Sequence, residues 1–100
     1  MIVNGVHIDE EALAEICRRY EVKELALFGS ILRPDFRPDS DIDVLVEFQP
    51  EASVGFLRLA GLQEDLAAAL RRSVDVVPKR GLKPLLRREV LQSSRVLYAA

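Results

Sequence analysis

The sequence predicts a small α/β (α+β) fold, in which helices cover a small mixed β-sheet. Apolar residues recur at helical spacing near the N-terminus and again across residues 55–72. Residues 41–48 alternate between apolar and polar, and two shorter apolar or β-branched runs, 23–28 and 73–77, end at turn-forming residues. Because the chain has 100 residues, we expect one domain spanning residues 1–100.

The composition limits the classes of protein to which the chain can belong. Hydrophobic residues make up 49% and charged residues 30%, and no apolar run approaches the length of a membrane span. No targeting segment is recognisable, so we expect a cytoplasmic protein with no membrane partner. The lone Cys17 excludes an internal disulfide, and because His7 is the only possible soft co-ligand, no zinc site of the usual type is expected.

The net charge of −2 argues against nucleic-acid binding by phosphate neutralisation, and no direct nucleic-acid partner is expected. The pairs Lys79-Arg80 and Arg87-Arg88 are the only candidate basic surface. Such pairs are more often the solvated face of a helix and its entry loop.

The first half of the chain predicts one helix and two strands. Asp9 can cap a helix that runs to about residue 20, with an apolar stripe formed by Leu13, Ile16, Cys17 and Tyr20. Residues 23–28 predict a buried strand that ends at a tight turn, Gly29-Ser30, and residues 34–40 predict a loop because of their two prolines. The regular alternation at 41–48 predicts a strand with Ile42, Val44, Val46 and Phe48 on one face and Asp41, Asp43, Leu45 and Glu47 on the other.

The second half predicts two helices and a further strand. Residues 55–72 predict a helix whose buried positions include Phe56, Leu59, Leu62, Leu66 and Leu70. Residues 73–77 predict a strand with Asp75 at its centre, and residues 82–91 predict a last helix with Pro84 in its first turn. The tail at 96–98 fits either a strand or a helix.

Two carboxylates dominate the candidate chemistry. At positions i and i+2 of a strand, Asp41 and Asp43 point the same way with Cα atoms roughly 7 Å apart, so both can approach one hard cation. The alternative is a solvated edge strand, which is the more frequent explanation of an isolated Asp-Ile-Asp.

Gly29-Ser30, upstream of these acids, is the second candidate feature. Glycine lets the backbone approach a phosphate closely, and the Ser30 hydroxyl and the backbone amides can donate to it. An ordinary turn capped by Ser30 is the structural alternative. Arg33 stands one turn later, where its side chain could pair with a phosphate or with an acidic neighbour.

Together these residues resemble a known pattern. Leu27-Phe28-Gly29-Ser30, then Arg33, then Ser40-Asp41-Ile42-Asp43-Val44-Leu45-Val46 is similar to the minimal nucleotidyltransferase family of the polymerase-beta superfamily. Asp75, on a strand after an intervening helix, falls where this family places a third carboxylate. Pro34 departs from the family, which more often has glycine after the arginine.

The resemblance implies a site for nucleotidyl transfer. Asp41, Asp43 and Asp75 would be the catalytic carboxylates and would hold magnesium, with two ions expected, while Gly29, Ser30 and Arg33 would bind the nucleotide, ATP. Asp75 would also help to deprotonate the attacking hydroxyl. For Asp75 the alternative interpretation is an acid at a strand edge.

The resemblance also implies a partner. The typical partner of this family is a HEPN-domain ribonuclease toxin. The resemblance implies that the small protein is the antitoxin of a type VII toxin–antitoxin pair and transfers AMP to a tyrosine of the toxin. It is also compatible with an oligomer that contains the toxin. Alternatives are an antitoxin that acts by binding alone, an enzyme that modifies a small molecule such as an aminoglycoside, and an enzyme that modifies nucleic acid.

Overall fold

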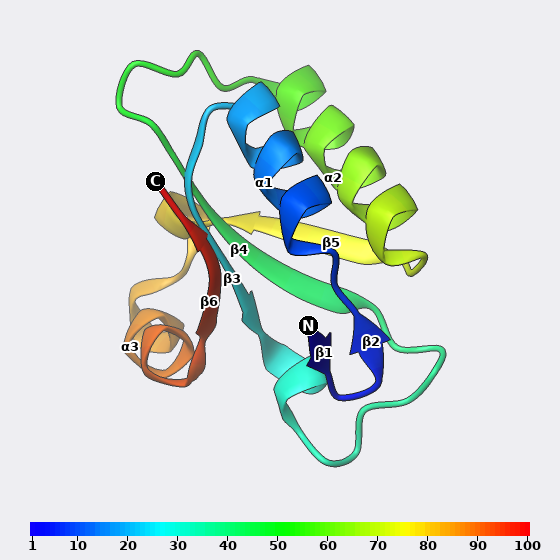
Figure 1. The fold of residues 1–100 in the computed structure, drawn as a ribbon. Coiled ribbons are helices and arrows are strands. Elements are labelled where there is room, and N and C mark those ends of the chain that lie inside the picture. Colours follow the sequence, from blue (N-terminus) through cyan, green and yellow to red (C-terminus); the bar gives the residue numbers. More distant parts are fainter.

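A four-stranded mixed sheet, in the order β5-β4-β3-β6, is the frame of the computed structural model, which describes residues 1–100 (Figure 1). Strand β3 pairs antiparallel with both β4 and β6, while β4 and β5 are parallel. The elements in chain order are β1 (Ile2–Val3), β2 (Val6–His7), α1 (Glu10–Arg19), β3 (Val22–Phe28), β4 (Ile42–Phe48), α2 (Phe56–Leu70), β5 (Val74–Pro78), α3 (Pro84–Ser93) and β6 (Arg95–Ala99).

Helices α1 and α2 lie side by side on one face of the sheet (Figure 1). Their inward positions recur at three- and four-residue steps, as an amphipathic helix requires, and they pack on the apolar face of the two central strands. The fully or nearly fully buried members of this core include Leu13, Cys17, Leu62, Leu66, Leu25, Leu27, Val44 and Val46. The predicted helices, the central strands and the mixed sheet are therefore confirmed.

The ends of the elements follow the expected local chemistry. The Asp9 side chain caps α1 by accepting hydrogen bonds from the backbone N–H groups of Glu11 and Ala12 at 3.1 and 3.2 Å. Cys17 is core, and burial raises the pKa of its thiol to about 12. The tail, for which strand and helix were both open, is strand β6, paired with β3.

Two helix starts differ from the sequence prediction. Phe56 was expected to be buried, but it is 82% exposed, because it occupies the first turn of α2, where no other element covers it. In α3 the apolar side predicted from the spacing exists, but no residue of this helix is buried and Leu85 is 95% exposed. Periodicity finds the apolar face of a helix but does not show how far the sheet beneath it extends.

The N-terminal hairpin, β1 and β2, was not predicted. Its turn is Asn4-Gly5, and both residues have positive φ, 48° and 84°. Asn-Gly between two β-branched residues is a recognised signal for a tight hairpin, since both residues tolerate this conformation. The signal was therefore present at residues 3–6.

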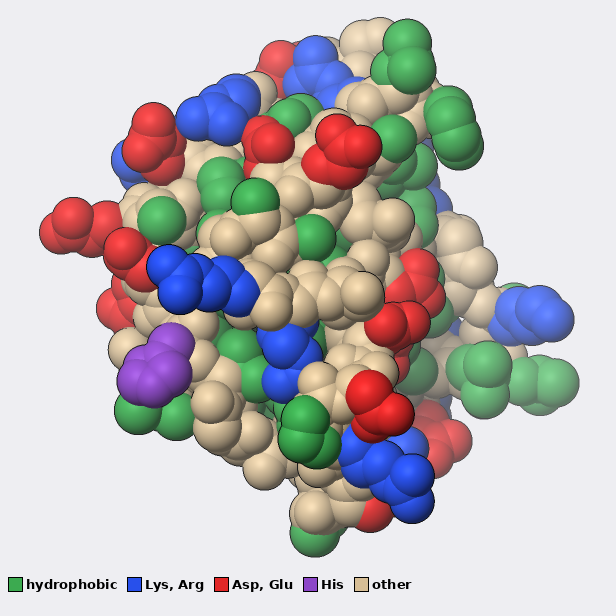
Figure 2. Space-filling view, turned by 90° about the vertical axis from the view of Figure 1, so that its right-hand side faces the viewer, with side chains coloured by type: hydrophobic (Ala, Val, Ile, Leu, Met, Phe, Trp, Pro, Cys, Tyr) green, Lys and Arg blue, Asp and Glu red, His purple; other side chains and the backbone are tan.

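Charged side chains of both signs are mixed with hydrophobic ones on the face seen in Figure 2, and hydrophobic side chains also project at its rim. None of the three α-helices combines the length and the apolar character needed to cross a bilayer.

Candidate active site

Three acidic residues lie at one end of the sheet, where β3 ends and β4 and β5 begin. Asp43 of β4 is the register partner of Asp75 in the parallel strand β5, and of Phe28, the last residue of β3, on its other side. Neighbouring strands are about 4.8 Å apart, so the two carboxylates stand side by side on one face. Asp41 precedes β4 by one residue. Strand pairing thus places Asp43 next to Asp75, and Asp41 lies just before β4 near both of them.

Gly29 follows Phe28 and therefore lies beside Asp43. Its φ is +75°, a conformation that residues with a side chain rarely adopt. A Cβ built at this position would collide with the Asp43 carboxylate, whose Cγ would be only 3.2 Å away. Both the backbone conformation and the lack of space require glycine here.

The environment of Asp43 disfavours its negative charge. Burial is the largest effect and raises the pKa of this carboxyl, and the like charges of Asp75 and Asp41 raise it further. A hydrogen bond from the Ser30 backbone and the positive charge of Arg33 act in the opposite direction but do not balance the increase. The site therefore holds excess negative charge, which a bound cation would stabilise.

The side chains of Ser30 and Arg33 lie near the acids but form no hydrogen bond with them. Residues Gly29–Leu32 form a short 3-10 helix that no side chain caps, so Ser30 does not act as the capping residue of the following turn. Arg33 is exposed and pairs with Asp35, its Nε lying 3.2 Å from Oδ1. Of the two partners expected for Arg33, a phosphate or an acidic residue, the structure shows the acidic residue. The positive charge of Arg33 still lowers the pKa of Asp43.

The donor set fits a hard divalent cation, since carboxylate oxygens are the ligands that Mg²⁺ prefers. However, no three acidic, histidine or cysteine side chains of the structure converge closely enough to enclose an ion. Asp41 and Asp75 are exposed and Asp43 is half-buried, so the outer two side chains have room to rotate toward the third.

Arg72, which the sequence analysis did not single out, holds the loop that leads to Asp41. Its Nη2 donates hydrogen bonds to the backbone oxygens of Arg37 and Ser40, each at 2.9 Å. Its guanidinium also lies over the Phe36 ring, 4.8 Å from the ring centroid. Arg72 lies between the end of α2 at Leu70 and the start of β5 at Val74, so it ties the 34–40 loop to the segment that enters β5.

Asn4 makes a comparable contact on the other side of the site. Its side-chain amide donates hydrogen bonds to the backbone oxygens of Ile31 and Arg33, both at 2.9 Å. The N-terminal hairpin thus fixes the end of the 3-10 helix that begins with Gly29 and Ser30. Sequence patterns do not reveal such contacts, because the partners are separated by 27 and 29 residues.

Replacing Arg72 should loosen the 34–40 loop. The Ser40 N–H is bonded to the Arg37 oxygen at 3.0 Å. In Arg72→Gln, we expect the hydrogen exchange of this amide to accelerate by about tenfold or more. Each lost hydrogen bond to a charged donor is worth about 1.5 to 3 kcal/mol before solvent compensation. Arg71→Gln is the control, because the Arg71 side chain makes no such contact. Equal protection in the two variants would contradict the role assigned to Arg72.

Comparison with known proteins identifies the family. The family model described as "Nucleotidyltransferase domain" matches residues 10–97. Protein adenylyltransferase MntA of Thermococcus cleftensis is 38% identical over 78 residues, which cover 78% of this chain and 77% of the relative. A candidate protein adenylyltransferase of Methanocaldococcus jannaschii is 35% identical over 79 residues, 79% of this chain and 83% of the relative.

Solved structures agree with this result. A candidate minimal nucleotidyltransferase is 38% identical and superposes with a TM-score of 0.71, with 85% of each chain covered. A toxin–antitoxin complex with AMP-PNP contains a chain of the same fold, with a TM-score of 0.73 at 24% identity, covering 93% of this chain and 75% of that one. A complex of the tri-AMPylated Shewanella oneidensis HEPN toxin with an MNT antitoxin contains a chain that superposes with a TM-score of 0.65 at 24% identity. The match covers 91% of this chain and 70% of that one.

Proposed function

This chain is an enzyme of the nucleotidyltransferase domain family, and we propose that it is a Mg²⁺-dependent protein adenylyltransferase, the antitoxin of a type VII pair. Its substrates would be ATP and a tyrosine of a cognate HEPN-domain toxin. The observation that carries the proposal is the meeting of Gly29, Asp43 and Asp75 at adjacent strand ends. The relatedness to MntA and the AMPylated toxin bound to an MNT antitoxin support the choice of AMP and of this partner.

Each site residue has a role in this proposal. Asp41, Asp43 and Asp75 would hold the metal, and Mg²⁺ when bound would supply Lewis-acid stabilisation of charge on the phosphate oxygens. The glycine backbone at position 29 would approach the triphosphate closely, and the Ser30 hydroxyl and the backbone N–H groups of the turn would donate to its oxygens. Arg33, if it exchanges Asp35 for a phosphate, adds positive charge there.

The transfer itself is a displacement at the α-phosphorus. The tyrosine oxygen forms a bond to this phosphorus, the bond to the bridging oxygen of the β-phosphate breaks, and pyrophosphate leaves. Asp75, exposed at the edge strand of the sheet, accepts the proton of the attacking hydroxyl. The chain would thus act as one cytoplasmic catalytic domain, with the acceptor protein contributing much of its own binding surface.

ATP labelled at either the α- or the γ-phosphate tests the reaction type. After incubation with Mg²⁺ and the proposed cognate HEPN-domain partner, we expect the α label on the partner and the γ label in pyrophosphate. Transfer of the γ label would mean a kinase reaction. Label on neither protein, with the complex still formed, would favour an antitoxin that acts by binding alone.

A further inference from the structure

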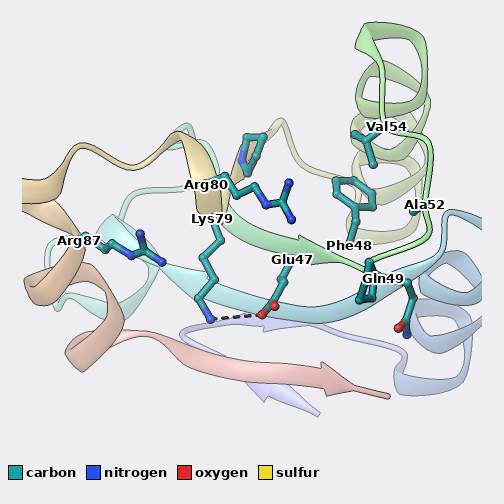
Figure 3. Close-up of a pocket in the computed structure, with 10 residues that line it drawn as sticks. Glu47, Phe48, Gln49, Ala52, Val54, Lys79, Arg80 and Arg87 are labelled. Carbon is teal, nitrogen blue, oxygen red and sulfur yellow. Dashed lines mark hydrogen bonds and ion pairs between the residues drawn. The ribbon is translucent and has the colours of Figure 1, made fainter.

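A hollow lies at the opposite end of the sheet from the three acids. It has a volume of about 510 Å³ and opens where the parallel strands β4 and β5 end, with the loop at 49–54 on one side and Arg87 of α3 on the other (Figure 3). Glu47, which lines it, is four residues beyond Asp43, a distance of about 13 Å along a strand. The hollow is therefore separate from the proposed catalytic site.

The hollow carries positive charge without a partner. Lys79 is engaged, with its Nζ 3.3 Å from Glu47 Oε1 and 3.6 Å from Glu24 Oε2. Arg80 and Arg87 are both exposed, and neither has a carboxylate within salt-bridge distance. Figure 3 shows Arg80 extending toward Phe48 and Arg87 pointing from α3 toward the strand ends. Residues 79–88 include five basic residues and no acidic one, so the excess charge extends beyond the hollow.

Apolar side chains line the same hollow, and others are close in sequence to its lining residues. Phe48 and Val54 face each other on one wall (Figure 3), and Val54 is 40% exposed. Just beyond Val54, Phe56 and Leu57 at the start of α2 are 82% and 84% exposed. Two residues before Arg87, Leu85 at the start of α3 is 95% exposed. Large apolar side chains that are exposed to this degree, and that are close in sequence to residues lining a concave charged site, are typical of a protein-binding surface.

We propose that this hollow, with Arg80, Arg87 and the exposed helix starts, docks an acidic segment with apolar side chains on the acceptor protein. The inference rests on the proposed function and adds the place where the substrate protein is held. The two unpaired arginines select carboxylates, which they can bind with two parallel hydrogen bonds. The apolar walls bury the neighbouring side chains of the segment, and the volume has room for a few of them.

RNA fits the same surface less well. Binding through phosphates favours a basic protein, whereas the whole chain has a net charge of −2 and Lys79, inside the hollow, is already paired with Glu47. The wall that faces Arg80 is apolar. An acidic polypeptide segment satisfies both the arginines and the apolar wall.

The test measures association with the proposed cognate HEPN-domain partner, by calorimetry without ATP. For the double variant Arg80→Glu plus Arg87→Glu we expect the Kd to rise by about tenfold or more, because each reversal replaces attraction by repulsion at the interface. The matched control is Arg18→Glu plus Arg95→Glu, which reverses two exposed arginines outside the hollow, and its Kd should stay within about twofold of the wild type. Thermal unfolding should be similar in both double variants.

Equal Kd values for the two double variants, or a wild-type chain that does not bind the partner, would overturn the docking proposal. The proposal would also be overturned if a short single-stranded RNA bound the wild type and the control variant but not Arg80→Glu plus Arg87→Glu. Failure of the transferase proposal is distinguishable: if the wild type binds through the hollow but transfers no label, the docking surface stands and the catalytic proposal falls. If both hold, the variant should keep its kcat at saturating partner and show a higher KM.

Discussion

Asp43→Asn should reduce AMP transfer by about a hundredfold to a thousandfold and leave the fold intact. Asp43 is the central acid, between Phe28 of β3 and Asp75 of β5. Loss of a preorganised charged group at the reacting centre typically costs this much in rate. The measurement is initial-rate label transfer with Mg²⁺ in excess. Asp39→Asn, which changes an exposed loop acid, should keep its rate.

The same variant should be more stable than the wild type at neutral pH when Mg²⁺ is removed. Burial and the charges of Asp75 and Asp41 raise the pKa of Asp43. A carboxyl with a raised pKa in the folded state favours folding while it is protonated, at low pH, and this contribution is lost as the pH rises through its folded pKa. In chelator, the melting temperature of Asp43→Asn should therefore exceed that of the wild type at neutral pH, and the difference should vanish in acid. A variant less stable at neutral pH would contradict the excess negative charge assigned to the site.

Gly29→Ala should impair both stability and activity. The positive φ of +75° costs a residue with a side chain about 1 to 2 kcal/mol, and the new Cβ would also collide with the Asp43 carboxylate. We expect a melting temperature lower by about 10 °C for a total cost near 2 kcal/mol. The rate of transfer should fall by about a hundredfold, because displacement of a reacting group by about 1 Å has this effect.

Gly81→Ala is the matched control for Gly29→Ala. A Cβ at Gly81 meets no atom within 4 Å, and its φ lies outside the left-handed region. The melting temperature and the rate of AMP transfer should therefore change little in Gly81→Ala. If Gly29→Ala behaved like this control, then neither the backbone conformation nor the close approach to Asp43 would matter to the site.

The sequence predicts the central part of this molecule because local patterns coincide there with burial. Alternation over residues 41–48 places Ile42, Val44 and Val46 on the buried face, as the structure confirms. The same alternation places Asp43 on the other face, where its register with Asp75 brings the two acids together. Period-2 patterns are informative where one face is buried and the other is not.

What the sequence does not predict depends on contacts between distant segments. Arg72 is one of many arginines until its hydrogen bonds to the 34–40 loop are seen. Phe56 fits the apolar stripe of α2, and only the extent of neighbouring elements leaves it exposed. The roles of Arg33 and of the three acids in binding nucleotide and metal stay predictions, since they concern ligands rather than the fold.

The intact mass of the partner toxin tests the central claim most directly. The HEPN protein is incubated with ATP, Mg²⁺ and either the wild-type chain or the variant Asp41→Asn plus Asp43→Asn, and a parallel wild-type sample contains a chelator. The account predicts a mass increase of one or more AMP groups with the wild-type chain and Mg²⁺ only, located on tyrosine. An unmodified toxin in a stable complex with the wild-type chain would contradict it and would leave inhibition by binding as the function.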